Sequence, residues 1–232
     1  MEQDLRAELD ERLAAAASGL EPDAQMVEVG RQLLLREFRK VLAHEAGSRS
    51  GADIEELHQL RVAMRKSRSV MRMLRPLVRA RVIRRHARTL RSVMRASGPV
   101  RDLDVLLEHV AGHEATPPEG AGQLPAMLQR QRSSARGKLL FVLYSDAWER
   151  FLPTYTDYLT TPGAGVRKGR ADRVTPQLVK HVLPPLVHLY LARVRAFGPT
   201  LEGADSRHLH DLRIHCKRLR YAVALHASLL GP

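Results

Sequence analysis

Basic side chains recur in this sequence at the spacing of helical turns. One histidine and six arginines follow one another at steps of three and four residues, at His58, Arg61, Arg65, Arg68, Arg72, Arg75 and Arg79. Residues at these steps share one face of a helix, so we expect a continuous cationic row. A guanidinium group offers a planar set of donors that matches phosphate oxygens, and it keeps its charge near neutral pH. The row therefore indicates binding of a chain of phosphates rather than of one small ligand.

The charge excess of the whole sequence lies in the same region. Between Leu57 and Arg101 there are fourteen basic residues and no acidic residue. The 232-residue chain has 38 Lys and Arg against 25 Asp and Glu, a net charge of +13, and without this window the balance is 24 to 25. Solvated helix faces usually mix both signs, because like charges at helical spacing repel each other. Such a concentration of one sign indicates that the window meets a polyanion.

Two neighbouring helices are expected to carry this charge. Apolar residues lie one position before the arginines of the first row. The next helix repeats the arrangement, with Arg84, Arg88, Arg91 and Arg95 beside Ile83, Ala87, Leu90 and Met94. One residue is about 100° of helix rotation, so each basic face borders a buried face. We expect two parallel cationic rows that are rooted in a packed core and face one groove.

Histidines and carboxylates near the rows raise the question of other chemistry. His58 and His210 each precede an arginine by three residues. Each is either a structural hydrogen-bonded residue or a donor to a phosphate oxygen. Neither is followed by a second ligand at metal spacing, so we expect no metal site and no cofactor. Asp102 and Asp104 are expected to cap a helix or to pair with neighbouring arginines rather than to form a catalytic dyad.

Helical apolar spacing runs through nearly the whole chain, and no convincing alternating strand is present. We therefore predict an all-α protein. The expected helices cover residues 1–20, 24–46, 54–75, 79–96, 102–110, 124–136, 138–159, 176–197 and 205–229. Asp53 is the expected N-cap after a turn over 47–53. The segment Ser97-Gly98-Pro99 is expected to end a helix, and breaks are expected at Ser145-Asp146 and at Pro153.

A motif occurs twice, at an offset of 152 residues. LHQLRVAMRKSR at residues 57–68 matches LHDLRIHCKRLR at residues 209–220, and the same offset aligns apolar residues of the preceding helices. This internal repeat indicates two similar helical halves related by a pseudo-twofold axis. After the motif the second copy loses the cationic row, with Ala224 in the place of Arg72. We expect the two halves to share a polyanion unequally.

These motifs resemble the signatures of the CHAD family, the conserved histidine α-helical domain. The pattern LHxLRVAxRKxR, its second copy and GxxRDLDVL at Gly98 carry the resemblance, which runs from about residue 27 to the C-terminus. It implies two helical-bundle halves around a basic cavity, binding of inorganic polyphosphate and association with polyphosphate granules. By this resemblance the binding residues are His58, Arg61, Arg65, Lys66, Arg68, His210, Arg213, Lys217, Arg218 and Arg220. The argument from the cationic rows adds Arg72, Arg88 and Arg91.

The expected domain organisation is an N-terminal extension over 1–25 and a CHAD-like domain over 26–232. The domain divides into a first half over 26–160, a linker over 161–173 and a partial second half over 174–232. The repeat offset places the counterpart of Gly98 beyond the last residue, so the second half is expected to be incomplete. Apolar residues such as Leu212, Leu219 and Val223 are then expected to be exposed and to promote a homodimer.

Three functions compete for this sequence. The first is non-catalytic binding of inorganic polyphosphate. The alternative is a nucleic-acid-binding protein, which the net charge supports, but only 4% of the residues are aromatic and no helix-turn-helix, zinc-finger or ribonucleoprotein motif is present. The third is an enzyme acting on polyphosphate, which needs a metal held by carboxylates. No Walker loop or Glu-x-Glu-x-Lys pattern occurs, so we expect no catalytic residue.

The expected location is the cytoplasm, including polyphosphate granules. The N-terminus lacks the basic-then-apolar order of a signal peptide, and no apolar run approaches the length of a membrane span, so no membrane partner is expected. Cys216 is the single cysteine, which excludes an intrachain disulfide.

Overall fold

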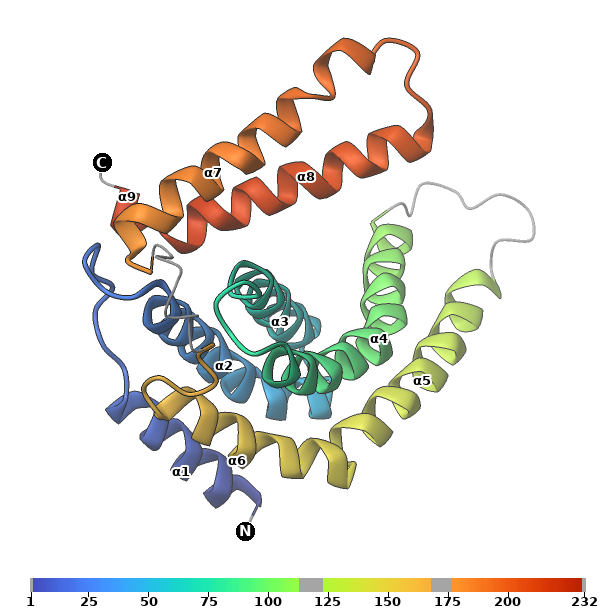
Figure 1. Cartoon of the computed structure of the whole chain (residues 1–232). Helices are drawn as coiled ribbons and strands as arrows, with labels where there is room; N and C mark the ends of the chain where they lie inside the picture. Colours follow the sequence, from blue (N-terminus) through green and yellow to red (C-terminus); the bar gives the residue numbers. More distant parts are fainter. Residues whose placement is uncertain (1, 113–122, 168–176, 231–232) are drawn as a thin grey trace.

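The computed structural model describes residues 2–112, 123–167 and 177–230, and most of that part of the chain is helical (Figure 1). In chain order the elements are α1 (Glu2–Ala15), α2 (Met26–Ser50), α3 (Ile54–Met73), α4 (Ala80–Ala111), α5 (Leu124–Leu143), α6 (Asp146–Thr160), α7 (Val179–Arg195), the 3-10 turn η2 (Gly198–Thr200), α8 (Ser206–Leu225) and α9 (Ala227–Leu230). Across these described residues, β geometry is limited to two isolated bridges. The all-α prediction is confirmed. Residues 168–173 of the expected linker lie outside the described residues.

Helix α2 is at the centre of the hydrophobic core. Its Leu34, Leu35 and Phe38 are almost completely buried, and α3 makes the most extensive contacts with it. The Phe38 ring meets the Tyr155 ring of α6 edge-on, with centroids 4.8 Å apart, and Tyr155 stacks on Phe151 at 4.9 Å. Five of the ten aromatic residues of the chain are buried in this way. The few aromatic residues therefore contribute mainly to the core.

The predicted cap at Asp53 is confirmed, and so is the predicted break at Ser145, where Ser145 caps the next helix. The Asp53 carboxylate accepts a hydrogen bond from the Glu55 amide at 2.8 Å, and Ser145 accepts one from the Trp148 amide at 3.3 Å. The turn before Asp53 is shorter than predicted, because α2 continues to Ser50. It ends at Gly51, whose positive φ of 69° lets its amide reach back to the Gly47 carbonyl. Pro153 does not break α6, contrary to the prediction.

The predicted helix end at Ser97-Gly98-Pro99 is wrong. Helix α4 runs through all three residues, with Pro99 inside it, and changes direction along its length (Figure 1). Proline removes one backbone hydrogen bond and crowds the preceding turn, which bends a helix that packing keeps intact. Asp102 and Asp104 therefore lie within α4 and cap nothing. Asp104 instead is buried and accepts a hydrogen bond from Arg132 of α5 at 2.5 Å.

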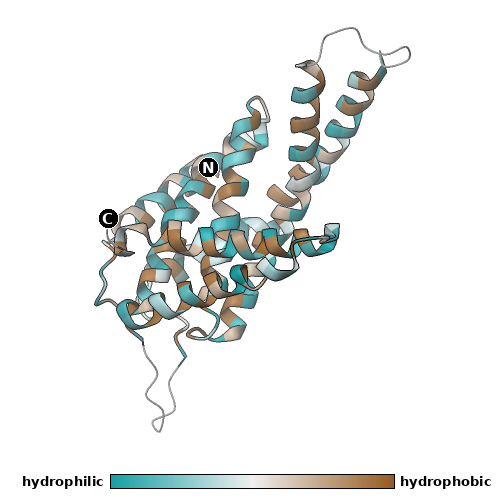
Figure 2. Cartoon of the chain, turned by 90° about the horizontal axis from the view of Figure 1, so that it is seen from above, coloured by the Kyte–Doolittle hydropathy of each residue, from teal (hydrophilic) through white to brown (hydrophobic). Residues whose placement is uncertain are grey.

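Beyond Pro99, the end of α4 and the start of α5 extend away from the other helices (Figure 2). Apolar side chains remain on this projecting pair, where four of them are between 37% and 45% exposed: Val105, Leu106, Leu124 and Met127. The Asp104–Arg132 ion pair joins the two helices near the base of the pair.

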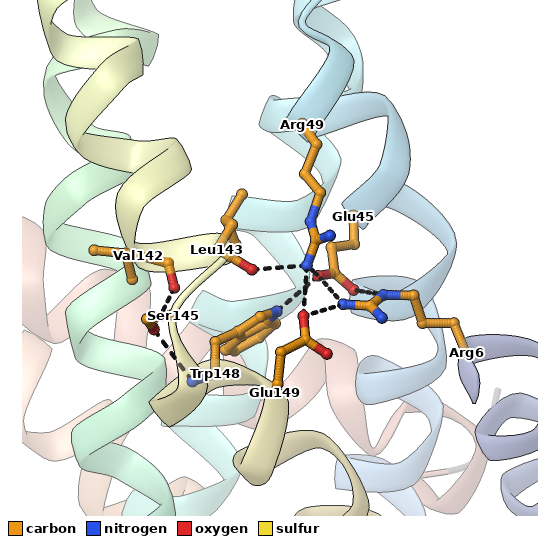
Figure 3. A network of polar contacts seen from close by, with 8 residues as sticks. All are labelled: Arg6, Glu45, Arg49, Val142, Leu143, Ser145, Trp148 and Glu149. Carbon is orange, nitrogen blue, oxygen red and sulfur yellow. Dashed lines mark hydrogen bonds and ion pairs between the residues drawn. The ribbon is translucent and has the colours of Figure 1, made fainter. Parts of the chain in front are cut away.

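A buried polar network ties the N-terminal helix to the body of the protein (Figure 3). The fully buried Glu45 carboxylate of α2 accepts hydrogen bonds from Arg6, Arg49 and the Trp148 indole, at 2.9, 2.7 and 2.7 Å. Glu149 accepts from the same two arginines, at 2.6 and 2.9 Å. Burial opposes the Glu149 charge, but these hydrogen bonds outweigh it and hold the pKa of that carboxyl below its usual value. Helix α1 is thus packed onto α2 and α6 rather than trailing from them.

Helices α7 and α8 form an antiparallel hairpin that lies across α2 and α3 (Figure 1). It is anchored near one end, where Val179, Leu183, Ala222 and Leu225 enter the core, and few of its other side chains are buried. Of the three apolar residues that were expected to be exposed, Val223 is 40% exposed, and Leu212 and Leu219 are less exposed and half-buried. The predicted pseudo-twofold relation and the homodimer stay predictions. Among the described residues, no helix combines the length and apolarity that crossing a bilayer requires.

Candidate polyanion-binding site

The arginines of α3 and α4 stand at the margin of the core, as their spacing predicts. On α3 the positions one residue earlier, among them Leu60, Met64 and Met71, are at most 2% exposed. On α4 Ile83 and Leu90 are buried in the same way. Because the buried stripe fixes the rotation of each helix, the adjacent arginines have little freedom in the direction they leave it.

The first of two adjoining pockets lies between α3 and α4 and has a volume of about 170 Å³. Its floor consists of Met71, Ile83 and Ala87. Its wall consists of five arginines, which are Arg68, Arg72, Arg75, Arg84 and Arg91. None of the described residues that line it is acidic, so the positive charge is not neutralised inside the pocket.

The second pocket, of about 530 Å³, continues along the same two helices. It is lined by Met94 and by four arginines, Arg68, Arg88, Arg91 and Arg95. Arg68 and Arg91 line both pockets, so they mark the centre of a shared surface. We call the surface made by the seven arginines of the two pockets the α3–α4 arginine surface. In the described part of the chain, none of the seven forms an ion pair with a carboxylate.

The second copy of the motif approaches the α3–α4 arginine surface through one residue. Burial lowers the pKa of Arg72, and the next cause is repulsion from Arg218 of α8. Helix α8 contacts α3, which explains how a residue of the second motif comes near the first row. Among the predicted binding residues, the pockets thus gather Arg68, Arg72, Arg88 and Arg91, and the fold brings Arg218 near Arg72.

Other predicted residues of α3 lie elsewhere. His58 and Arg65 line neither pocket, and Arg61 is turned onto the backbone of α4. Lys66 points toward α2, where its ammonium nitrogen lies 4.0 Å from the buried Glu37 carboxylate. One residue after Arg65 is about 100° of helix rotation, which takes Lys66 away from the row.

Predicted residues of α8 other than Arg218 are exposed and line neither pocket; they are His210, Arg213, Lys217 and Arg220. The Arg220 guanidinium lies over the Tyr221 ring, 5.2 Å from its centroid. Three residues of the α3–α4 arginine surface were absent from the predicted set: Arg75, Arg84 and Arg95. The same spacing of three and four residues could have identified them.

Among the described histidines, the largest pKa shift belongs to His86, which is outside the predicted site. His86 of α4 is buried among aromatic rings and stacks on Tyr158, with centroids 4.9 Å apart. Burial, followed by repulsion from Arg85, lowers the pKa of His86 to about 4. Its role is in the core, since its ring packs against the buried Tyr155 ring and His86 lines neither pocket. In the described ranges, no three His, Cys, Asp or Glu side chains gather as a metal site would require.

Comparison with known proteins gives two kinds of match. The structure is similar to the crystal structure of the CHAD domain from the plant Ricinus communis, with a TM-score of 0.72, 22% identity, and 90% of this chain and 68% of that chain covered. It is also similar to PptA from Streptomyces chartreusis, with a TM-score of 0.58, 16% identity, and 87% and 75% covered. At these identities the two structures support the fold alone. A search of curated protein sequences gives no match.

The sequence itself matches the family model of the CHAD domain. The match spans residues 32–232, which includes both copies of the repeated motif, at 57–68 and 209–220, and every residue of the α3–α4 arginine surface. By this match over most of its length, the chain belongs to the CHAD domain family.

Proposed function

We propose that this protein binds inorganic polyphosphate, without hydrolysing it, at the α3–α4 arginine surface. The observation that carries the proposal is that Arg68 and Arg91 line two adjoining pockets whose described lining residues include no carboxylate. A surface with seven cations and no internal counter-charge holds mobile counterions. An anion with many charges releases those counterions on binding, and this release drives its affinity.

The shape of the surface favours a chain of phosphates over a single phosphate. The two pockets share two arginines and follow the same pair of helices, so one extended ligand can occupy both. Arginine forks bind phosphate oxygens in pairs of hydrogen bonds, each stronger than a neutral one. A single phosphate engages only a few of these groups, whereas a chain engages them in series.

Nucleic acid fits this surface less well. Binding of single strands commonly adds stacking of bases on aromatic side chains. No aromatic residue lines either pocket, and Trp148, Phe151 and Tyr155 are buried in the core. Polyphosphate carries phosphate charges like a nucleic acid but has no bases. It therefore needs no aromatic side chain for stacking, and the absence of aromatic residues from the pocket linings does not weaken its binding.

Binding without catalysis is part of the proposal. Phosphoryl transfer on such a ligand generally requires a divalent ion beside the phosphates, held by carboxylates. The Asp104 carboxylate of α4 is engaged by Arg132, and no acidic residue is among those that line the two pockets. Release of orthophosphate from polyphosphate in the presence of Mg²⁺ or Mn²⁺ would refute this part.

We further propose that α8 contributes a smaller share of the ligand contacts, through Arg218, and that binding places the protein on polyphosphate granules.

A titration tests the proposed function. Long-chain polyphosphate should bind far more tightly than orthophosphate at equal phosphate concentration, and the logarithm of the binding constant should fall linearly with the logarithm of salt concentration. Polyphosphate should also displace double-stranded DNA. Equal affinity for orthophosphate and the long chain would overturn the proposal.

A further inference from the structure

Arg61 belongs to the signature motif, yet its guanidinium is directed at a backbone segment rather than at either pocket. Its Nη1 donates to the Met94 carbonyl of α4 at 3.1 Å and to the Ser97 hydroxyl at 2.8 Å. Ser97 is fully buried, and its hydroxyl donates to the same Met94 carbonyl at 3.3 Å. These three groups form a closed set of contacts between α3 and α4.

The segment that Arg61 contacts is the one that proline weakens. Pro99 has no amide hydrogen, so the Arg95 carbonyl one turn earlier loses its helical partner. Gly98 also lowers the helix propensity of this turn. The Arg61 side chain passes beside Gly98, where a Cβ atom would lie 3.7 Å from Nη1. A side chain from α3 thus donates hydrogen bonds to the turn in which Pro99 leaves a neighbouring carbonyl without its helical partner.

That turn also carries part of the α3–α4 arginine surface. Met94, whose carbonyl accepts from Arg61, lines the second pocket together with Arg91 and Arg95. We propose that Arg61 is a positioning residue, which holds α4 helical across Pro99 and thereby keeps Arg91 and Arg95 facing Arg68. The proposal rests on polyphosphate binding at this surface, but it assigns Arg61 a different role from the phosphate contact that its place in the motif suggests.

The burial of the Arg61 guanidinium and its lowered pKa agree with a positioning role. Its Nε is buried without a hydrogen-bond partner, so part of the group is not available to an incoming ligand. Burial lowers its pKa, with further lowering by Arg65 and Arg101 and an opposing effect of Asp102. A residue that met phosphate directly would gain from open access, whereas this one is partly enclosed by its own fold.

The first test needs no ligand. In Arg61→Met, hydrogen exchange at the backbone amides of residues 95–98, 100 and 101 should rise at least tenfold relative to wild type, because a buried charged hydrogen bond is worth about 1.4 kcal/mol or more. Arg65→Met is the matched control, since it removes the same group one turn along the same helix and has no side-chain hydrogen bond to α4. Unchanged exchange in Arg61→Met would overturn the proposal even if polyphosphate binding is confirmed.

The second test separates positioning from ligand contact by affinity for long-chain polyphosphate. Arg61→Lys keeps the charge, but its shorter side chain brings the ammonium less far toward the Met94 carbonyl and the Ser97 hydroxyl, so it should lose about tenfold in affinity, as Arg61→Met does. Wild-type affinity in Arg61→Lys would contradict the proposal. In an Arg91→Met/Arg95→Met background the loss from Arg61→Met should disappear, because the residues through which Arg61 acts are gone. A full additive loss there would assign Arg61 a direct ligand contact instead.

Discussion

Arg218 on α8 lies close enough to Arg72 on α3 to lower the pKa of the Arg72 guanidinium, second only to the effect of burial. A residue of the second motif copy and an arginine of the α3 row are thus held near each other with like charges. Repulsion between them costs folding free energy in the free protein. A polyanion placed beside both would remove that cost, so ligand binding and stability should be linked.

Long-chain polyphosphate should therefore raise the thermal midpoint of unfolding. At a ligand concentration about 100-fold above Kd, binding to the native state alone contributes about 2.7 kcal/mol. For a chain of this size that is a shift of about 5–10 °C, measurable by calorimetry. Orthophosphate at the same phosphate concentration is the control and should shift the midpoint much less. An equal shift would show that the site does not respond to chain length.

The two copies of the motif should contribute unequally to binding. Reversing Arg65 and Arg68 to Glu should weaken polyphosphate binding more than reversing Lys217 and Arg220. Arg68 lines both pockets, whereas Lys217 and Arg220 line neither. Both double variants change the charge by the same amount, so each serves as the control for the other in one titration. Equal losses would refute the asymmetry.

Mild acid should destabilise the protein through His86. The pKa of about 4 in the folded state is below the ordinary value of 6.5, so the unfolded chain binds the additional proton first as pH falls. The contribution of neutral His86 to the free energy of unfolding is complete above pH 6.5 and is lost as the pH falls toward 4. Between pH 7 and pH 5 it amounts to about 2 kcal/mol. Urea unfolding at these two pH values measures it, and His86→Gln should show a pH dependence weaker by that amount. An unchanged pH dependence in the variant would show that His86 is not the responsible group.

The ion pair at the base of the α4–α5 pair should also be important for stability. Asp104 is 2% exposed, so Arg132→Met leaves a buried carboxylate without its partner. We expect a loss of about 3 kcal/mol in the free energy of unfolding, because an uncompensated buried charge is costly. The double variant Asp104→Asn/Arg132→Met should recover part of that loss. A single variant as stable as wild type would contradict the account of this contact.

Local rules predicted the parts of the fold that depend on neighbouring residues. The Asp53 cap, the break at Ser145 and the side-by-side arrangement of buried and basic faces on α3 all follow from spacings of four residues or fewer. Pro99 was misread because its effect depends on residues far away in the sequence. Helix α4 continues through it where Arg61 donates to the Met94 carbonyl and α5 packs alongside. Single-sequence patterns do not contain these contacts.

In the candidate site too, local spacing predicted some residues, whereas contacts between residues far apart in the sequence decided the others. The row spacing identified Arg72, Arg88 and Arg91, because they lie on helices whose rotation the apolar stripe fixes, and the family resemblance identified Arg68. The same resemblance also gave Arg61 and Lys66 as ligand contacts, but the direction of each side chain depends on its neighbour in space. Arg61 meets the backbone of α4, and Lys66 approaches Glu37 of α2. His86 gave no signal, since only the folded structure surrounds it with tyrosine rings.

The central claim is that Arg68 and Arg91 form the centre of a polyphosphate site. The most direct measurement is the affinity of Arg68→Glu/Arg91→Glu for long-chain polyphosphate at fixed salt. Arg130→Glu is the reference, because Arg130 is an exposed arginine of α5 outside both pockets. We predict about a hundredfold loss in the double variant, from two charge-assisted contacts of about 1.4 kcal/mol each, and a change of less than threefold in Arg130→Glu. A double variant that still folds and binds within threefold of wild type would contradict the account.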